Sequence, residues 1–459
     1  MQRVAIRTHS LVAVIRAATD RRILALAVPT LGALLAQPLF VLVDTAMVGH
    51  LGVPQLAGLS VAGTLVSSVV GLLVFLAYQT TASVARLVGS GRPDAALRSG
   101  IDGLWFAGLL GILAFAALML FGGPLVRALG ADGEVADQAL AYVRAAAPGV
   151  VGMLVTYAAT GTLRGLSRVR IILVVTVSAA VMNAALNALL IYGVGLGVAG
   201  SGLGTSITEL TMAAVLVAAV RREAVRLGVP LRPTRAGAVG AGRDGFPLFV
   251  RTLSLRASML LTVWVAASLG AVSLSAHQIV ISLWLLSAYA LDAVAIAAQT
   301  LIGEALGGGR PEEARALLRR CLAWGIGSGL VVGGVFALTA PWLPLVFTPD
   351  DGVRSVATVT LWIAAAFVPL AGFVFVLDGV LIGAGDGRYL AWTGIVNLAT
   401  YVPFALVVVG WRPEGGLAWL WVSYCVAYMG SRAVTLGLRA RSDDWLVLGA
   451  SSRRAAAAQ

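Results

Sequence analysis

The sequence has no lysine, only two cysteines and little charge of any kind, since 12% of its residues are Asp, Glu, Lys or Arg. Cys321 and Cys425 provide neither a disulfide framework nor a zinc motif, which require paired or clustered cysteines. The chain also lacks a Walker A motif, an HExxH motif and a glycine-rich loop set between a soluble strand and a helix. The sequence therefore does not indicate ATP-driven pumping, zinc-dependent hydrolysis or dinucleotide binding.

Long apolar runs dominate the sequence instead. Of 459 residues, 59% are hydrophobic, and the mean hydropathy is +0.92, which is more apolar surface than a soluble core of this length can bury. A helix that crosses about 30 Å of hydrocarbon needs roughly 20 residues. Twelve runs of that kind can be counted, from 23–48 to 416–437. The sequence therefore predicts an all-α integral membrane protein with twelve transmembrane helices.

Arginine supplies all of the positive charge, and the formal net charge is +12. Arginines gather before the first apolar run and in the second, fourth, sixth and eighth loops, whereas the intervening loops hold only Arg127, Arg354 and Arg412. By the positive-inside rule, this alternation places both termini in the cytoplasm and requires an even number of spans. The net charge is thus a topology signal, and nucleic acid is not an expected partner.

An internal repeat organises the chain. A Gly-x-Gly-Arg-Pro motif at 89–93 recurs at 307–311, an offset of 218 in the numbering. The same offset joins Pro29 to Pro247, Gly161 to Gly379 and Arg170 to Arg388. A constant offset over this length indicates duplication. Because six spans per copy is an even number, both copies enter the membrane from the same side, which predicts two six-helix lobes related by a pseudo-two-fold axis along the membrane normal.

The expected parts follow from the repeat and from composition. A segment rich in Arg, Gly and Pro, which includes Pro230 and Pro233, separates the two copies. The expected parts are a cytoplasmic N-terminus at 1–22, an N-lobe at 23–220, a cytoplasmic linker at 221–245, a C-lobe at 246–438 and a cytoplasmic tail at 439–459.

Acidic residues inside apolar spans are the main functional candidates, because a carboxylate in hydrocarbon is costly. Three stand out: Asp44, Asp292 and Asp378. At the offset of the repeat, the equivalent residues of the other copy are Thr262, Val74 and Thr160, respectively. Neither lobe therefore needs the other's acids in order to fold. This argues for a function, with a structural hydrogen bond peculiar to one lobe as the alternative.

Polar residues near these acids extend the candidate set. Asn183 and Asn187 lie four residues apart, on one helical face, where their amides could share a pocket with Asp44. Gln37 lies two turns before Asp44 on the same face. The alternative for each amide is a helix-to-helix hydrogen bond of about 1 kcal/mol. Pro29 is predicted to bend the first span, and the bend to change as the protein switches states.

Four residues are weaker candidates: Glu209, Asp102, Arg251 and Arg256. The two acids fit a cavity wall or a membrane interface equally well. The two arginines could snorkel or pair with acids. A buried carboxyl can hold either a proton or a cation, and the two states exclude each other. This exclusion is the chemistry that coupled transport needs.

The run from Leu42 to Gly52 resembles the multidrug and toxic compound extrusion (MATE) family, and within it the DinF-like branch. Residues 288–292 and 377–384 and the duplicated plan agree, so the resemblance covers nearly the whole chain. It implies a V-shaped pair of six-helix lobes that open alternately outward and inward. It also implies export of mostly cationic, amphipathic compounds against an inward flow of H⁺ or Na⁺.

The resemblance implies roles for particular residues. A first-span acid matching Asp44 belongs to a protonated polar network in the N-lobe, and Gln37 and Asn183 match other members of that network. The sequence departs from the family at Asn187, where relatives often carry an aspartate. Because an amide cannot titrate, Asp44 must work alone there or share coupling with acids of the other lobe.

We therefore expect a monomeric, multi-pass antiporter of the bacterial cytoplasmic membrane that exchanges organic cations for H⁺, with Na⁺ as the alternative ion and without cofactor or metal. Asp44 would bind the ion, in a pocket shaped by Gln37, Asn183 and Asn187. Asp292 and Asp378 would supply negative potential to a C-lobe cavity.

Two alternatives to this expectation remain. The first is a flippase for lipid-linked precursors or an exporter of polysaccharides, which would need basic residues in a central cavity, where only Arg251 and Arg256 qualify. The second is a membrane-embedded enzyme or a receptor. An enzyme would need His, Ser or Cys converging on catalytic acids, and a receptor would need a sizeable domain outside the bilayer; neither is found.

Overall fold

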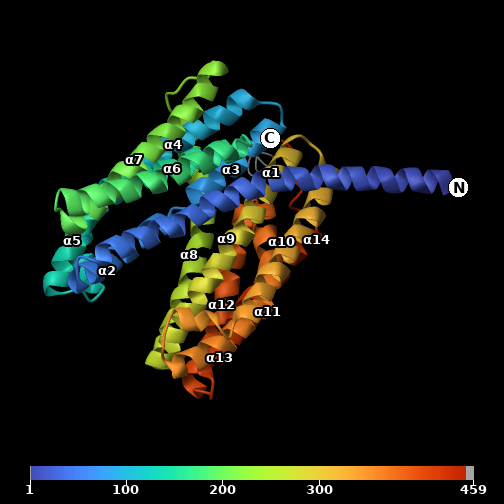
Figure 1. The fold of residues 1–459 in the computed structure, drawn as a ribbon. Coiled ribbons are helices and arrows are strands. Elements are labelled where there is room, and N and C mark those ends of the chain that lie inside the picture. The colour runs from blue at the N-terminus through green and yellow to red at the C-terminus, as the bar shows by residue number, and fades with distance from the viewer. Residues whose placement is uncertain (1, 451–459) are drawn as a thin grey trace. The chain divides into compact units, whose positions relative to one another are not determined.

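In the computed structural model, the backbone is described for residues 2–450, and the side chains are described from residue 17 onward. The described chain is helical almost throughout (Figure 1). The first half consists of α1 (Gln2–Gly49), α2 (Val53–Leu72), α3 (Phe75–Gly89), α4 (Pro93–Ala128), α5 (Gly133–Gly165), α6 (Val169–Asn187), the π-helix η1 (Ala188–Gly193) and α7 (Gly197–Arg226). The second half consists of α8 (Arg235–Ser268), α9 (Ala271–Gly307), α10 (Pro311–Thr339), the 3₁₀-helix η2 (Leu343–Val346), α11 (Asp351–Gly383), α12 (Gly387–Trp411), α13 (Gly416–Ser423), the π-helix η3 (Tyr424–Met429) and α14 (Gly430–Arg441).

Eleven helical segments of the described chain are long and apolar enough to cross a membrane, with α2 and α3 counted as one. The predicted twelfth span corresponds to α13, η3 and α14, which follow one another without a gap from Gly416 to Arg441. A π-helical turn interrupts this segment, so no single α-helix covers its length. The prediction of an all-α membrane protein is confirmed.

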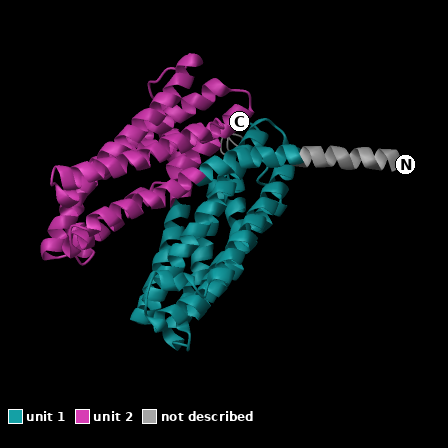
Figure 2. Ribbon diagram, in the orientation of Figure 1, with its two compact units in different colours: residues 1–31, 250–459 teal, residues 32–249 magenta. Residues whose placement is uncertain are grey.

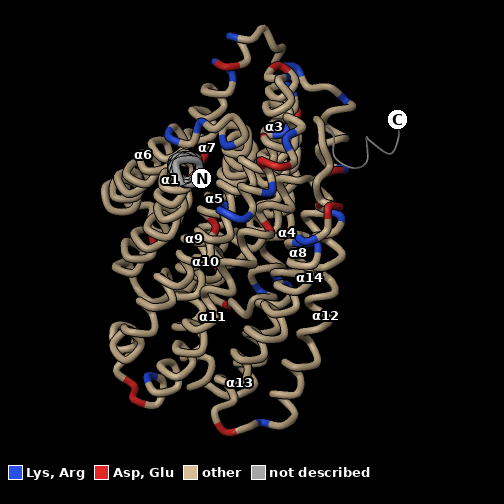
Figure 3. Tube along the Cα trace, turned by 90° about the vertical axis from the view of Figure 1, so that its right-hand side faces the viewer, with Lys and Arg blue, Asp and Glu red and all other residues tan. Residues whose placement is uncertain are grey.

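Charged residues lie mainly at helix ends and in loops, while the lengths between them are nearly all uncharged (Figure 3). Large apolar side chains lie on the surface of these lengths, as at Leu120 and Val331, which are 73% and 68% exposed. In water such a surface would be unfavourable, but in a bilayer it contacts lipid. Buried alanines, glycines and aliphatic side chains fill the contacts between helices.

The repeated motif forms the same turn in both halves. Gly91 and Gly309 adopt left-handed φ angles of 71° and 69°. The next residue donates its backbone N–H to the carbonyl five residues earlier, Arg92 to Leu87 and Arg310 to Ala305. Proline then opens α4 and α10, where its missing N–H has no helical partner to lose. The sequence repeat is thus a repeat of local structure.

One pair of glycines sets the same close helix crossing in each half. A Cβ on Gly161 of α5 would lie 2.6 Å from the Ala77 carbonyl oxygen of α3, and one on Gly379 of α11 would lie 2.2 Å from that of Ala295 in α9. On both sides of the crossing, the residues of the two halves are related by the offset of the repeat. Small residues let membrane helices approach this closely.

The predicted linker is shorter in the structure than 221–245. Helix α7 continues to Arg226 and α8 begins at Arg235, which leaves 227–234 irregular, with both prolines inside it. The arginine-rich flanks continue the helices because arginine is a good helix former. Asp102 of α4 accepts hydrogen bonds from the Thr234 N–H at 2.8 Å and from the Thr234 hydroxyl at 2.9 Å. Asp102 therefore anchors the linker and takes no part in the clusters that Asp44 and Asp378 form.

The chain divides into two compact units, residues 1–31 with 250–459 and residues 32–249 (Figure 2). The division cuts α1 and α8, in each case two residues after the matched prolines Pro29 and Pro247. The predicted N-lobe, 23–220, contains the whole of the first span, whereas residues 23–31 belong to the unit with residues 250–459.

The start of α1 is tied to the second half. Arg22 pairs with Glu313 at 2.9 Å, and Asp20 pairs with Arg320 at 2.5 Å. Both partners belong to α10. The first turns of α1 that have described side chains therefore pack with the unit that contains residues 250–459. Residues 451–459 of the predicted tail lie outside the described residues.

Candidate functional site

Asp44 of α1 lies at the centre of a buried polar cluster with α6 and α7. Its Oδ1 accepts a hydrogen bond from Asn187 Nδ2 at 2.9 Å and another from the hydroxyl of Ser201. Asn187 Nδ2 also donates to Asn183 Oδ1 at 3.2 Å. Asp44 is 5% exposed and the other three side chains at most 1%. Asp44, Asn183 and Asn187 therefore come together as predicted.

Local backbone features place these groups. Asn187 is the last residue of α6, and the π-helix η1 begins at the next residue. Such π-helical turns are frequent at functional sites. Gly204 lets the Asn187 side chain lie flat against α7, since a Cβ there would be 2.0 Å from Asn187 Oδ1. At the end of α1, the Tyr192 hydroxyl of η1 donates to the Met47 carbonyl at 2.6 Å.

Among the described residues, the Asp44 cluster contains no cation. The partners of the Asp44 carboxylate are one amide and one hydroxyl, both neutral. Two buried amide atoms, Asn187 Oδ1 and Asn183 Nδ2, have no hydrogen-bond partner in the described part of the protein. Because buried polar groups are normally satisfied, this is a place where a proton, an ion or a polar ligand group can be accommodated.

A second acid, Glu209 of α7, is buried in the same unit. It is 3% exposed and makes no hydrogen bond or ion pair with another described residue. Both Asp44 and Glu209 lie within electrostatic reach of the Tyr142 hydroxyl on α5. Helix α5 approaches closely because Gly152 faces Glu209: a Cβ on Gly152 would lie 2.6 Å from the Glu209 carbonyl carbon. This weaker sequence candidate thus lies in the same unit as Asp44.

The second half holds its buried acid differently. Asp378 of α11 accepts from Arg251 of α8, at 3.2 Å from Nε and 2.7 Å from Nη2, and also from Arg432 of α14. All three residues are buried, with at most 9% of each exposed. The Arg432 guanidinium also lies 5.8 Å from the ring centre of Tyr428. The cluster therefore joins three helices and carries one more positive than negative charge.

This cluster corrects the prediction that Asp378 supplies negative potential to a C-lobe cavity. Two arginines neutralise one carboxylate and leave a net positive charge. The prediction overlooked Arg432, which lies 54 residues from Asp378 in the chain. Asp292 of α9 is only half-buried, beside Tyr289, and Arg256 of α8 lies within reach of the same tyrosine. The interior of the second half is thus not an acidic region.

The residue of the second half that matches Asp44 also makes a buried polar contact. At the offset of the repeat, Asp44 corresponds to Thr262 and Asn183 to Tyr401. The Thr262 hydroxyl and the Tyr401 hydroxyl are 2.8 Å apart, and both side chains are buried. The matched helices therefore meet through polar groups in both halves, but only the first half places a carboxylate there.

The family model described as MatE matches the chain twice, at residues 29–189 and 247–407. The two matches begin at the matched prolines Pro29 and Pro247, which confirms the repeat and its offset. Together they cover more than half of the chain. The chain belongs to the MATE family of transporters.

Relatives of this MATE transporter come from plants and bacteria. Protein DETOXIFICATION 44, chloroplastic, of Arabidopsis thaliana is 30% identical, with 93% of this chain and 83% of the relative covered. DNA damage-inducible protein F of Escherichia coli is 26% identical, with 93% and 94% covered. A MOP superfamily transporter of Pyrococcus furiosus superposes with a TM-score of 0.83 at 21% identity, with 92% of this chain and 95% of that chain covered. The last comparison shows the MATE fold.

Sequence reasoning missed one residue of the Asp44 cluster and one residue of the Asp378 cluster. Ser201 lies in a run of glycines and small residues at the start of α7, and nothing in that run singles out its hydroxyl. Arg432 lies in the interrupted twelfth span, where it reads as one more cytoplasmic arginine. A count of intramembrane charge would have found Arg432, because a buried Asp378 needs a counter-charge.

One predicted member of the first-half cluster lies apart from it. Gln37 is exposed on α1 and makes no hydrogen bond among the described residues. Pro29 is half-buried and lies two residues before the division between the compact units. Its predicted role as a bend therefore concerns the segment of this MATE transporter in which α1 passes from one unit to the other.

Proposed function

We propose that this MATE transporter exports small organic cations in exchange for protons, and that Asp44 binds the coupling proton. The observation that carries the proposal is the neutral surrounding of Asp44, a buried carboxylate that is held by an amide and a hydroxyl and, among the described residues, by no arginine. An ionised carboxylate in a low dielectric is unfavourable. Binding of a proton or an organic cation is therefore favoured over an ionised carboxylate with no bound cation.

The exchange follows from the geometry of the cluster. When Asp44 is ionised, Asn187 and Ser201 both donate to it, and its charge is available to a cation. A proton on Asp44 removes that charge and turns one carboxyl oxygen from a hydrogen-bond acceptor into a donor. The buried amide oxygen of Asn187, which has no partner among the described residues, can accept this new hydrogen bond. Protonation and cation binding then exclude each other, which is the condition for antiport.

Glu209 is proposed as a second proton-binding group of the same unit. Asn187 cannot titrate, whereas Glu209 provides a buried carboxyl on the neighbouring helix α7. Both carboxyls lie within electrostatic reach of the Tyr142 hydroxyl. Asp44 therefore need not share coupling with acids of the second half.

The change of state is proposed to occur in α1 at Pro29. The first turns of α1 are tied to α10 by the Asp20–Arg320 and Arg22–Glu313 pairs, while Asp44 lies in the other compact unit. Proline leaves a helix carbonyl without its partner, so α1 bends more easily at this position. We place the protein in the bacterial cytoplasmic membrane with both termini in the cytoplasm.

The test is efflux from proteoliposomes with an imposed pH gradient and no sodium, using a panel of fluorescent organic cations. We expect efflux from wild-type protein and background efflux from Asp44→Asn. A matched control is Asp351→Asn, because the Asp351 side chain is 94% exposed. Full gradient-driven efflux by Asp44→Asn would overturn the role of Asp44, and an absolute need for sodium would overturn the choice of ion.

A second candidate is transport of an anionic amphipathic compound, such as a lipid-linked precursor. The observation that favours it is the excess positive charge of the Arg251–Asp378–Arg432 cluster. A reversed polarity of the binding pocket is reported for the Pyrococcus furiosus transporter and taken there to suggest a different function. Adding anionic amphipaths to the same panel separates the two candidates: transport of anions alone would favour the second.

A further inference from the structure

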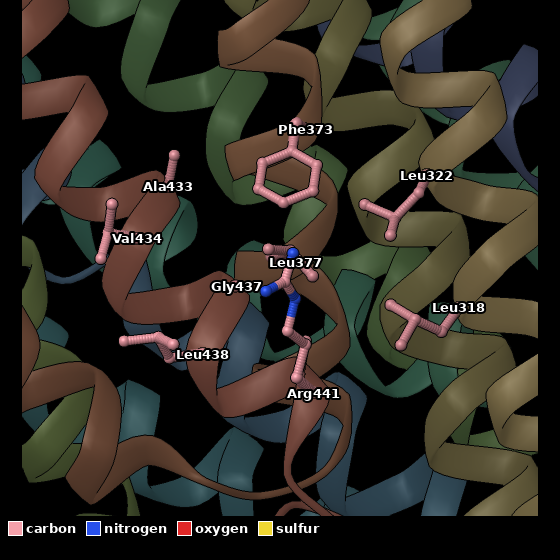
Figure 4. A pocket seen from close by; sticks show the side chains of 10 residues that line it. Leu318, Leu322, Phe373, Leu377, Ala433, Val434, Gly437, Leu438 and Arg441 are labelled. Carbon is pink, nitrogen blue, oxygen red and sulfur yellow. The ribbon is translucent and has the colours of Figure 1, made fainter.

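A groove of about 420 Å³ lies on α11 between α10 and α14 (Figure 4). Phe373 and Leu377 of α11 form its floor, Leu318 and Leu322 of α10 form one wall, and α14 forms the other. The groove exists because α14 presents small residues to it, Ala433 and Gly437 among them. Val434 and Leu438 on the same wall are 60% and 61% exposed, so the groove opens to the surface of the protein. In a bilayer that surface faces lipid.

One charged side chain lines this apolar groove. Arg441 is the last residue of α14, and its side chain extends into the groove as far as Leu377 (Figure 4). Arg441 makes no hydrogen bond or ion pair with another described residue, in contrast to its neighbours. Arg439 binds Asp386 at 2.7 Å and Asp444 at 2.6 Å.

The carboxylates near the end of α14 are therefore already engaged. Asp444 and Asp386 pair with Arg439, and Asp443 pairs with Arg315 of α10 at 2.7 Å. A guanidinium beside hydrocarbon and without a carboxylate favours an anion from outside the chain. Because the rest of the groove is apolar, the anion must be attached to an apolar chain.

The position of the groove along the membrane normal also agrees with binding of an anion that carries an apolar chain. Arg441 ends α14 on the side where α10 begins after the Gly-x-Gly-Arg-Pro turn, which the arginine distribution assigns to the cytoplasm. The cytoplasmic leaflet carries the anionic lipids, and basic pockets between transmembrane helices on this side bind their headgroups. The floor at Phe373 and Leu377 then continues from headgroup depth towards the middle of the membrane.

We propose that this groove binds one anionic phospholipid of the cytoplasmic leaflet, with its phosphate on Arg441 and an acyl chain along α11. The proposal is independent of the coupling ion and of the substrate. A phospholipid here fills the space between α10 and α14, so it joins the two helices that flank α11, the helix that carries Asp378.

The experiment is native mass spectrometry of the full-length protein in detergent, titrated with phosphatidylglycerol or with phosphatidylcholine of the same acyl chains. Wild-type protein is expected to retain phosphatidylglycerol more tightly. Arg441→Gln should weaken its binding about fivefold, the effect of one basic residue at a headgroup, and Arg441→Lys should keep most of it. Gly437→Leu should weaken both lipids, because a side chain there projects onto Phe373, which lies 3.6 Å from an added Cβ.

Arg319→Gln is the matched control. Arg319 is an exposed arginine of α10 that, among the described residues, also has no carboxylate partner, but it does not line the groove. Its substitution should leave binding of phosphatidylglycerol unchanged. Equal binding by wild type and Arg441→Gln, an equal loss in Arg319→Gln, or displacement of the lipid by inorganic phosphate would each overturn the proposal. Size-exclusion profiles and unfolding temperatures establish that every variant is folded.

Discussion

The buried acids of the first half, Asp44 and Glu209, contact no arginine within the described residues, whereas Asp378 of the second half lies between Arg251 and Arg432. At the position that matches Asp44, the second half has Thr262, hydrogen-bonded to Tyr401. At the position that matches Asp378, the first half has Thr160. Asp44 and Asp378 are thus each matched by a neutral hydroxyl in the other half.

The difference separates what the repeat shares from what it does not. The turns at Gly91 and Gly309 and the crossings at Gly161 and Gly379 are alike, because backbone geometry allows few solutions there. Buried charge is not shared. A carboxylate with neutral partners can change its charge, whereas one fixed by two guanidiniums must stay ionised, because its protonation would leave two buried cations without an anion. We therefore propose coupling for the first half, whereas the cluster of the second half holds three helices together.

The strongest test of this comparison moves the acid from one half to the other. In Asp44→Thr with Thr262→Asp, we expect proton-driven efflux to fall to the level of protein-free vesicles, because the new carboxylate would meet Tyr401 in place of Asn187 and Ser201. The measurement is efflux under a pH gradient, with each single variant alongside. Rescue of transport in the double variant would mean that the two positions are interchangeable.

The next effect concerns stability. Asp378→Asn should destabilise the protein by about 3–5 kcal/mol, because it leaves Arg251 and Arg432 buried without an anion. Asp44→Asn should cost less than about 1 kcal/mol, since an amide oxygen still accepts a hydrogen bond from Ser201. Thermal unfolding in detergent compares the two. Equal losses would show that the two carboxylates are held alike.

Proline substitution tests the bend in α1. Pro29→Ala should slow efflux about tenfold, equivalent to roughly 1.4 kcal/mol on the barrier to switching. The repeat supplies the control, because Pro247 of α8 also lies two residues before the division between the units, but α8 carries Thr262 where α1 carries Asp44. Pro247→Ala should therefore slow efflux less than Pro29→Ala. If initial rates fell equally in both variants, the bend would belong to the repeated scaffold and would have no special link to the coupling site.

The smallest effect concerns a turn that occurs once in each half. Ser167 and Gly385 lie at matched positions and adopt left-handed φ angles of 59° and 74°. Only glycine takes this conformation without strain, so Ser167→Gly should stabilise the protein by about 0.5–1 kcal/mol. Gly385→Ser should destabilise it by a similar amount. The equivalence of the two turns would be contradicted if both unfolding temperatures rose, if both fell, or if Ser167→Gly lowered and Gly385→Ser raised the unfolding temperature.

The fold could be predicted well from the sequence because its signals are local and repeated. Apolar length indicated the spans, and the constant offset indicated the two copies. For the site, the cost of a carboxylate in hydrocarbon pointed to Asp44, and helical spacing placed Asn183 and Asn187 on one face. The same reasoning misjudged Asp378 and overlooked Ser201, because their partners come from helices distant in the chain.

By itself, then, the sequence determined that acids such as Asp44 lie within apolar spans, that many such spans are present and that the plan is duplicated, since these depend on composition, length and period. Tertiary structure alone decided which charges are paired. Pairing depends on which helices pack together, and one meeting of α8, α11 and α14 turns an apparent negative site into a positive one. The described residues around Asp44 include no such arginine, which is why we propose that this carboxylate exchanges a proton for a cation.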